Sequence, residues 1–305
     1  MMQQVSKLLF LPLLMLPYIY GEVKIPNFFN NHMVLQRGIE VPIWGWAEPG
    51  EKVNVNFATQ RISTKADQNG KWMLRLKPMK ANSIGQTLVI GNHSIRDVLV
   101  GEVWICSGQS NMQWRLKQSL NSEGEIAAAN YPEIRQLKME RTAAYLPRTN
   151  ASGEWITCST STAHDFTAVG YFFARELHKE TNVPIGIIDA SWGGTGIEPW
   201  IPETGYCMVS ELEKEKNELH KSLPVNDENI KEWNDYLDQV ESWLPGAKKM
   251  VSQEELPVNI PDRPDNNMPV THHGMTKIFN AVINPIIPYG IRGVIWYQGG
   301  SSWGQ

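Results

Sequence analysis

The sequence predicts an α/β fold: an α/β/α sandwich around a parallel sheet, preceded by a small N-terminal β-sandwich domain. Three observations support this. Residues 22–97 form short runs of alternating apolar and polar residues, which is typical of half-buried strands. From residue 98 onward, apolar strands alternate with segments of helical periodicity, which favours a parallel sheet covered on both faces. The chain has 305 residues, which is long enough for two domains.

The first 20 residues have the pattern of a secretory signal peptide. Lys7 supplies a positive start, and residues 8–20 are apolar apart from two prolines. This run is short for a membrane span, so we expect cleavage near Gly21 and a secreted or periplasmic protein. The alternative is an uncleaved membrane anchor.

Residues 22–97 are expected to form the β-sandwich domain. The segments 53–57 and 72–76 alternate in polarity, and turn-forming residues at 48–50 and 67–70 separate the predicted strands. Such a domain could bind sugars or act as a scaffold. We favour a scaffold, because no aromatic cluster stands out on one strand face.

Residues 98–305 are expected to form the larger domain. Strands are predicted at 103–106, 184–190 and 293–297, and helices at 111–118 and 168–180. A parallel sheet carries its functional residues at the carboxyl ends of its strands.

An insertion of two charged helices, divided by Pro224, is predicted at about 208–243. Residues 245–269 contain five prolines and are expected to form an extended loop. Residues 279–285 are expected to be the end of a helix.

Charge and cysteine content exclude several classes of function. The chain has 28 basic and 32 acidic residues, a net charge of −4, which gives no sign of a nucleic-acid or membrane partner. Cys106 is expected to be a buried apolar filler, and an oxidising compartment would permit a bridge between Cys158 and Cys207. The spacing of Cys and His does not suggest a zinc site.

Ser110 is the candidate nucleophile, because it follows a buried strand and a flexible glycine. The apolar run 103–106 ends at Gly108, and a helix is expected to begin at Asn111. The N-terminus of a helix favours the negative charge that develops during acyl transfer. The alternative is that Ser110 only caps the helix.

The sequence around Ser110 resembles the nucleophile block of the sialate O-acetylesterase family within the SGNH hydrolases. Further matches occur in the order that this family shows. The matching segments are Gly101–Trp104 with Gly108–Met112, Ser191–Thr195, Trp296–Gly299, and, in the first domain, Met33–Arg37 and Val41–Ala47.

The resemblance implies an SGNH-like fold and a carbohydrate O-acetylesterase acting on an acetylated sugar, with Ser110 as nucleophile. The oxyanion donors are predicted to be the backbone N–H groups of Ser110 and Gly194 and the side-chain amide of Gln298. Other residues expected in the pocket are Gln109, Asn111, Gly193 and His273. Neither a metal nor an organic cofactor is implied.

The chain departs from the family pattern in two places. After Gln298 it has Gly299-Gly300-Ser301-Ser302, where the family shows Gly-Glu-Ser-Asn. The family base is a histidine a few residues after an aspartate near the C-terminus, so we expect a chain truncated before that block. The pairs His272-His273 and His164-Asp165 are weak substitutes.

These departures leave two alternatives to an active esterase: a catalytically incomplete glycan-binding homologue, or a fragment that does not fold alone. The identity of the sugar and the oligomeric state do not follow from the sequence.

Overall fold

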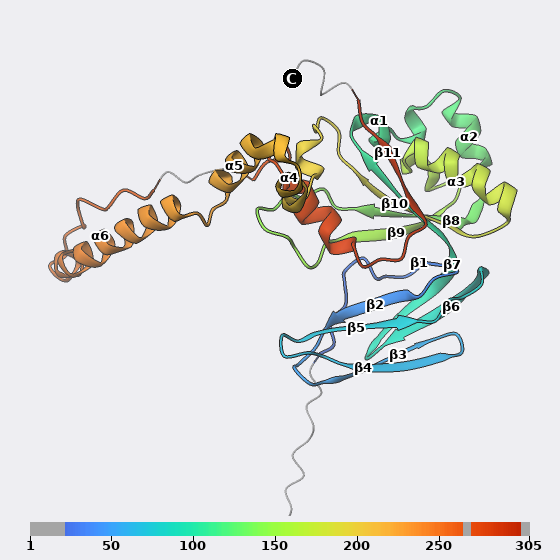
Figure 1. Ribbon diagram of the computed structural model, residues 1–305, viewed down its shortest axis with the longest axis horizontal. Coiled ribbons are helices and arrows are strands. Elements are labelled where there is room, and N and C mark those ends of the chain that lie inside the picture. The colour runs from blue at the N-terminus through green and yellow to red at the C-terminus, as the bar shows by residue number, and fades with distance from the viewer. Residues whose placement is uncertain (1–21, 265–269, 300–305) are drawn as a thin grey trace, which may run out of the picture.

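The computed structural model describes residues 22–264 and 270–299 (Figure 1). The predicted signal peptide and the altered residues Gly300–Ser302 lie outside the described residues. The strands are β1 Val34–Gln36, β2 Val41–Trp46, β3 Lys52–Phe57, β4 Gln60–Lys65, β5 Lys71–Leu76, β6 Asn82–Ile90, β7 His93–Gly108, β8 Tyr131–Met139, β9 Gly153–Cys158, β10 Ile185–Ser191 and β11 Gly293–Tyr297. The α-helices are α1 Ser110–Gln113, α2 Ser122–Ala128, α3 Ala168–Thr181, α4 Glu203–Met208, α5 Glu213–Ser222 and α6 Asp227–Ser252.

The larger part of the molecule is built on a mostly parallel sheet in the order β9-β8-β10-β7-β11, which confirms the predicted α/β class. Strand β10 pairs in parallel with β8 and with β7, and β11 pairs in parallel with β7, whereas β9 is antiparallel to β8. Strand β10 is buried along its whole length, as expected of a central parallel strand.

Both faces of this sheet are covered, and alternate residues of β10 pack into two separate cores. Ile187 lies in the core with Tyr171 and Ala174 of α3. Ile188 lies in the other core, with Ile278 and Ala281 from the end of the chain. Full burial of one such isoleucine contributes roughly 2 kcal/mol.

The predicted β-rich N-terminal region is present and consists of two sheets. Strands β4, β3 and β6 continue into the first half of β7, while β2 and β5 form a separate antiparallel pair. In β3, Val53, Val55 and Phe57 are buried and alternate with exposed residues. Figure 1 shows this region below the larger sheet.

Strand β7 links the two regions, and the domain boundary expected at residues 97 and 98 lies inside it. Its first part pairs with β6, and its second part pairs with β10 and β11. Asp97 interrupts the ladder with a positive φ of 56°. The buried Arg135 pairs with its carboxylate, with 2.9 Å between Nη2 and Oδ2. The two regions therefore share one continuous strand rather than a flexible linker.

The helix predicted over residues 111–118 is wrong in extent, because α1 ends at Gln113. After it, Trp114 accepts a hydrogen bond from Ala168, and Leu116 donates one to Phe166. Backbone pairing with the segment before α3 thus replaces the intrahelical bonds that a longer helix would make.

The loop predicted from residue 245 is also wrong at its start, because α6 continues through Pro245 to Ser252. A proline removes one backbone hydrogen bond and does not always end a helix. Here Trp243 donates a hydrogen bond to the Val258 carbonyl, so the following segment supports the helix just before Pro245, and Ala247, just after it, is buried. Residues 279–286 form a π turn followed by a 3₁₀ turn.

The three cysteines are free, so the structure contains no bridge between Cys158 and Cys207. Cys106 is fully buried, and burial raises the pKa of its thiol above the ordinary range, as expected of an apolar filler. Among the described residues, no helix has the length and apolarity needed to cross a membrane.

Candidate active site

The carboxyl ends of β7, β10 and β11 meet at Gly108. In the strand register, Gly108 lies level with Ser191 of β10 and Tyr297 of β11. Its φ is +126°, and a Cβ atom built there would lie 2.2 Å from the Tyr297 carbonyl oxygen. Only glycine fits this junction, because a side chain would collide with the neighbouring strand.

Ser110 is the first residue of α1, two positions beyond this junction, and its side chain is exposed. Its Oγ donates a hydrogen bond to Oε1 of Gln109, at 3.2 Å. Since the first residue of a helix has no intrahelical acceptor, the Ser110 N–H is free of one, and none is found among the described residues. Helix α1 has four residues, so its dipole is weaker than the predicted longer helix would supply.

The loop after β10 lies against Ser110. A Cβ atom on Gly193 would be 3.4 Å from the Cα and Cβ atoms of Ser110. The Gly193 N–H donates to Oε1 of Gln113, at 2.5 Å. Gly194 has a φ of +81° with open space around it, and within residues 22–264 and 270–299 no hydrogen bond involves its N–H.

Gln298 follows β11 and reaches the same loop. Its Nε2 donates a hydrogen bond to the Thr195 carbonyl, at 2.9 Å, which leaves one amide hydrogen unassigned. Its Oε1 is buried and has no hydrogen-bond partner among the described residues. The structure thus brings Ser110, Gly194 and Gln298 to one end of the sheet, while their predicted roles stay predictions.

A cavity of about 390 Å³ opens beside Ser110. It is lined by Ser110, Gln113, Trp114, Gln118, Arg141, Trp192, Gly193 and Gly194. Of the other residues predicted to lie in the pocket, Gln109 is buried beside Ser110, and Asn111 is exposed on α1 outside the lining.

The two neighbouring histidines lie next to Trp192, which lines this cavity, and neither is among the lining residues. His272 stacks on Trp192, with 4.9 Å between the ring centroids. The ring centroids of His272 and His273 are 3.9 Å apart. Burial, and then the nearby His273, lower the pKa of His272. In the described parts of the chain, no histidine forms a hydrogen bond with Ser110, so the structure assigns no base to the predicted nucleophile.

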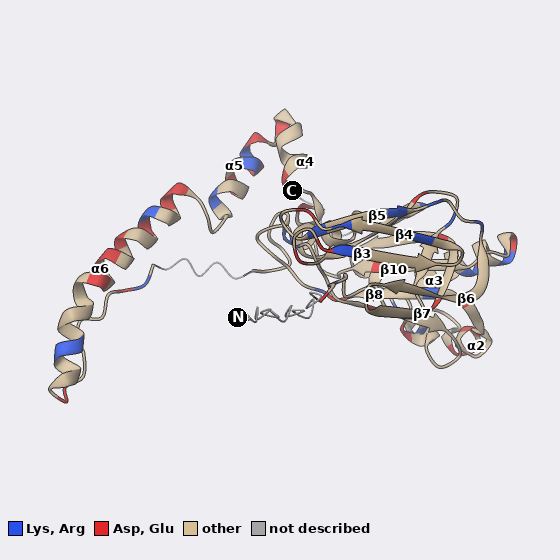
Figure 2. Ribbon diagram, turned by 90° about the horizontal axis from the view of Figure 1, so that it is seen from below, with Lys and Arg blue, Asp and Glu red and all other residues tan. Residues whose placement is uncertain are grey.

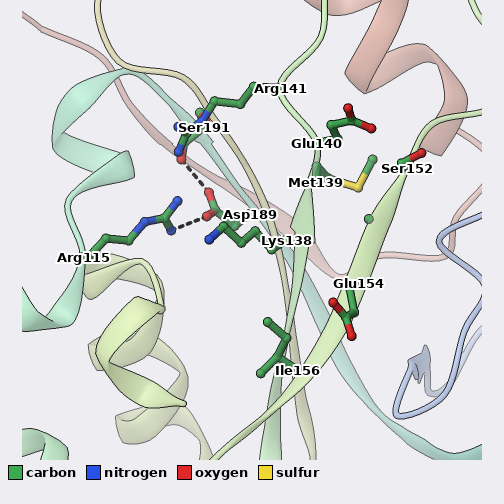
Figure 3. Close-up of a pocket in the computed structure, with 11 residues that line it drawn as sticks. Arg115, Lys138, Met139, Glu140, Arg141, Ser152, Glu154, Ile156, Asp189 and Ser191 are labelled. Carbon is green, nitrogen blue, oxygen red and sulfur yellow. Dashed lines mark hydrogen bonds and ion pairs between the residues drawn. The ribbon is translucent and has the colours of Figure 1, made fainter. Parts of the chain in front are cut away.

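A second cavity of about 550 Å³ shares Arg141 with the first (Figure 3). At its base, the buried Asp189 accepts hydrogen bonds from Arg115 Nη1 and from Ser191 Oγ, both at 2.5 Å. Arg141 Nε donates to the Ser191 carbonyl, at 3.1 Å. Burial, and then the charge of Arg115, lower the pKa of Arg141.

The pair of Arg115 and Asp189 was not predicted from the sequence, although a signal for it exists. Asp189 is the one charged residue in the otherwise uncharged run 184–191, and a buried carboxylate requires a partner. The identity of that partner does not follow from the sequence, since Arg115 lies 74 positions away.

An aromatic cluster in the N-terminal region was also missed. A third cavity, of about 320 Å³, lies between the β2-β5 pair and the segment around Pro285. Trp44, Trp46 and Trp72 line it, together with polar groups that include Lys71 and Asn284. Trp44 and Trp46 lie two residues apart on β2, whereas Trp72 lies opposite Gly45 on β5, so the sequence of one strand shows only two of the three.

Among the residues with described positions, no group of three or more His, Cys, Asp or Glu side chains is arranged to hold a metal ion.

Comparisons with known proteins identify a family of esterases. The family model for carbohydrate esterases described as sialic acid-specific acetylesterases matches residues 100–262, which is more than half of the chain. The sialate O-acetylesterase of Rattus norvegicus is 29% identical over 301 residues, covering 90% of this chain and 52% of the rat protein. The sialate O-acetylesterase of Homo sapiens is 27% identical over 302 residues, covering 92% of this chain and 49% of the human protein.

A solved structure of a carbohydrate acetylesterase is also similar to this chain. The crystal structure of a carbohydrate acetylesterase from Xanthomonas citri matches with a TM-score of 0.66 and 31% identity, covering 92% of this chain and 52% of that chain. The chain therefore spans about half the length of the relatives that it matches. From the extent of the family match, supported by this fold, the chain belongs to the sialic acid-specific acetylesterase family of carbohydrate esterases.

Proposed function

We propose that this protein is a secreted carbohydrate O-acetylesterase, with Ser110 as its nucleophile. The observation that carries the proposal is the meeting of three strand ends at Gly108, which brings Ser110 against the Gly193 and Gly194 loop beside an open cavity. The names of the relatives, which are sialate or carbohydrate acetylesterases, support an acetylated sugar as substrate.

In the proposed reaction, Ser110 Oγ attacks the acetyl carbonyl carbon while a base takes the hydroxyl proton. The bond between that carbon and the sugar oxygen then breaks, and the sugar leaves with a proton as a free hydroxyl. Water hydrolyses the acetyl-Ser110 intermediate to acetate and regenerates the serine.

The oxyanion formed in both steps needs preorganised donors. The N–H groups of Ser110 and Gly194 suit this role, because neither has an acceptor within the described residues. Gln298 keeps one amide hydrogen after its bond to the Thr195 carbonyl. Loss of one such donor typically lowers kcat by about 10²–10³-fold.

The base is not assigned to a residue described here. The resemblance implies a histidine that follows an aspartate, whereas neither His272 nor His273 lines the cavity that holds Ser110. Experiments on this protein should therefore include a version extended to the length of its relatives.

Export from the cytoplasm rests on residues 1–20, where Lys7 precedes an apolar run. N-terminal sequencing of the protein recovered from the medium or the periplasm tests this. A mature chain that begins near Gly21 is the expected result, and recovery of the full-length chain in the membrane fraction would contradict it.

Acetate release from 4-nitrophenyl acetate, O-acetylated sialic acid and acetylated xylan tests the catalytic proposal. Ser110→Ala is expected to lose activity in both the 305-residue chain and the extended chain. Ser63→Ala is the matched control, because Ser63 is exposed on β4 in the N-terminal region. Full activity in Ser110→Ala would reject Ser110 as the nucleophile.

A second candidate is a glycan-binding protein without catalysis. The observations that favour it are the lack of a histidine hydrogen-bonded to Ser110 in the described residues and the cavity lined by three tryptophans. Aromatic rings with a few polar groups are common in ligand sites. Sugar binding that persists without acetate release, and that Trp46→Ala abolishes, would support this candidate over the esterase.

A further inference from the structure

Helix α6 projects from the body of the molecule. Figures 1 and 2 show it extending away from both sheets, with the following segment returning alongside it. The helix has 26 residues, and at 1.5 Å per residue it is about 39 Å long. Two contacts hold the returning segment: Trp243 Nε1 donates to the Val258 carbonyl at 2.8 Å, and Arg263 lies 5.3 Å from the Trp233 ring centroid.

One edge of α6, which carries Trp233 and Trp243, contacts the returning segment. A second edge carries apolar residues that are exposed. Ile230, Leu237, Leu244 and Val251 follow one another at intervals of seven residues, and their exposed fractions are 44%, 51%, 40% and 60%. We call these four residues the α6 seam. Single exposed apolar residues are common on protein surfaces, but a continuous apolar stripe indicates a binding surface.

The spacing of the seam identifies the kind of partner that fits it. Trp233, Val240 and Ala247 lie three residues after the first three seam positions, so α6 carries two apolar positions in each repeat of seven. Of the second set, Ala247 is buried and Trp233 contacts Arg263 of the returning segment, so the seam is the edge of this apolar face that is left for a second helix. Pro245 lies about 100° around the helix from Leu244, so its ring points away from the seam.

The charges along α6 indicate the direction of that second helix. Residues 227–241 include six acidic residues and one lysine, whereas residues 242–252 include only the basic Lys248 and Lys249 as charged residues. Figure 2 shows most of the acidic residues of α6 in one half of the helix. The acidic Glu254 and Glu255 follow only after the helix ends. Parallel copies would place acidic halves together, but antiparallel copies place each basic end beside the acidic half of the other.

We propose that α6 mediates self-association, by pairing antiparallel with α6 of a second copy of this chain. Pairing about a twofold axis between Leu237 and Leu244 places Leu237 of one copy against Leu244 of the other. Ile230 then faces Val251 in the same way. Each copy contributes the same surface, so the assembly closes as a dimer.

Sedimentation velocity and light scattering of the full chain test this proposal. A dimer is expected at micromolar concentration. The double variant Leu237→Glu with Leu244→Glu is expected to raise the dimer dissociation constant at least about thirtyfold, because it places charges at the centre of the interface. At concentrations well below the dimer dissociation constant, its thermal unfolding should match that of the wild type, since the seam is exposed in the single chain. Leu120→Glu is the matched control, because Leu120 is 95% exposed outside α6 and its change should leave the dimer intact.

A charge variant tests the direction of pairing. Lys248→Glu with Lys249→Glu should weaken the dimer at low salt, and adding Glu232→Lys, which this register places opposite Lys249, should restore part of the lost affinity. A monomer at every concentration up to about 100 μM would overturn the proposal. So would a dimer that the double leucine variant leaves intact. A dimer that the charge variant strengthens would overturn the antiparallel arrangement.

Discussion

The backbone N–H of Gly193 donates a hydrogen bond to the side-chain Oε1 of Gln113, and the two atoms are 2.5 Å apart. This bond ties the loop after β10 to the short helix that carries Ser110. Because the Gly193 N–H is used in this way, Gly194 is the one of these two glycines whose N–H has no acceptor among the described residues. We expect this bond to determine which backbone donor the loop offers to a substrate.

Replacement of Gln113 by alanine should therefore reduce acetate release more than stability. We expect a loss of roughly 0.5–1.5 kcal/mol in unfolding free energy. We expect kcat to fall by about 10–100-fold, because small displacements of catalytic groups are costly. Gln113→Glu keeps an acceptor oxygen in place and is the control. If kcat is unchanged in Gln113→Ala while the fold is intact, the bond does not position the site.

Gly108 should not tolerate any side chain. A Cβ atom would lie 2.2 Å from the Tyr297 carbonyl oxygen, and the φ of +126° is unfavourable for other residues. We expect Gly108→Ala to lower the unfolding free energy by at least about 3 kcal/mol, through both strain and collision. Gly50→Ala is the control: its φ is +79° but no atom lies within 4 Å, so only about 1–2 kcal/mol should be lost. If urea unfolding shows equal losses of unfolding free energy for Gly108→Ala and Gly50→Ala, the collision with the Tyr297 carbonyl does not contribute.

The buried pair of Arg115 and Asp189 should be important for stability. Asp189 is 3% exposed and Arg115 is 7% exposed. We expect Asp189→Ala to cost about 3–5 kcal/mol, because it leaves a guanidinium buried without its partner. Glu176→Ala removes an exposed carboxylate that pairs with Arg175 and Lys179, and its unfolding midpoint should not change. A small loss in Asp189→Ala would mean that water replaces the carboxylate.

Local patterns in the sequence predict the strands and helix that surround the site. Strand β11 has the predicted bounds, β10 differs by one residue at each end, and α3 ends one residue later than expected. These elements are marked by apolar periodicity and by stop signals such as Asn182, whose positive φ of 51° ends α3.

Long-range contacts account for what the sequence did not predict. The helix at Ser110 is shorter because the segment after it pairs with the backbone before α3, and Arg115 of that segment reaches Asp189, 74 positions away. Strand β7 crosses the expected domain boundary because Arg135 supports the kink at Asp97. The aromatic cavity depends on the pairing of two strands, which places Trp44 and Trp46 on one and Trp72 on the other. No local pattern specifies such partners.

The kink at Asp97 also predicts how stability depends on pH. Partial burial alone would raise the pKa of Asp97, but hydrogen bonds from His32 and Arg135 outweigh it and hold the pKa below its ordinary value. In the unfolded chain an aspartate has a pKa of about 3.9. The unfolded state therefore binds the proton more readily, and the stabilisation present above about pH 4 is lost as the pH falls through the lower, folded-state pKa.

Asp97→Asn should remove this dependence. Urea unfolding between pH 2 and pH 6 is expected to show the wild-type protein more stable than Asp97→Asn at pH 6, with the difference narrowing as the solution is acidified below about pH 4. His32→Gln keeps the pair between Asp97 and Arg135, where Nη2 and Oδ2 are 2.9 Å apart. The stability difference between wild type and His32→Gln should therefore narrow less steeply on acidification than the difference between wild type and Asp97→Asn. Curves for wild type and Asp97→Asn that stay parallel down to pH 2 would show that the carboxylate is not stabilised in the folded state. The kink in β7 would then depend on the hydrogen bonds from Arg135 to the backbone carbonyls of His32 and Asp97.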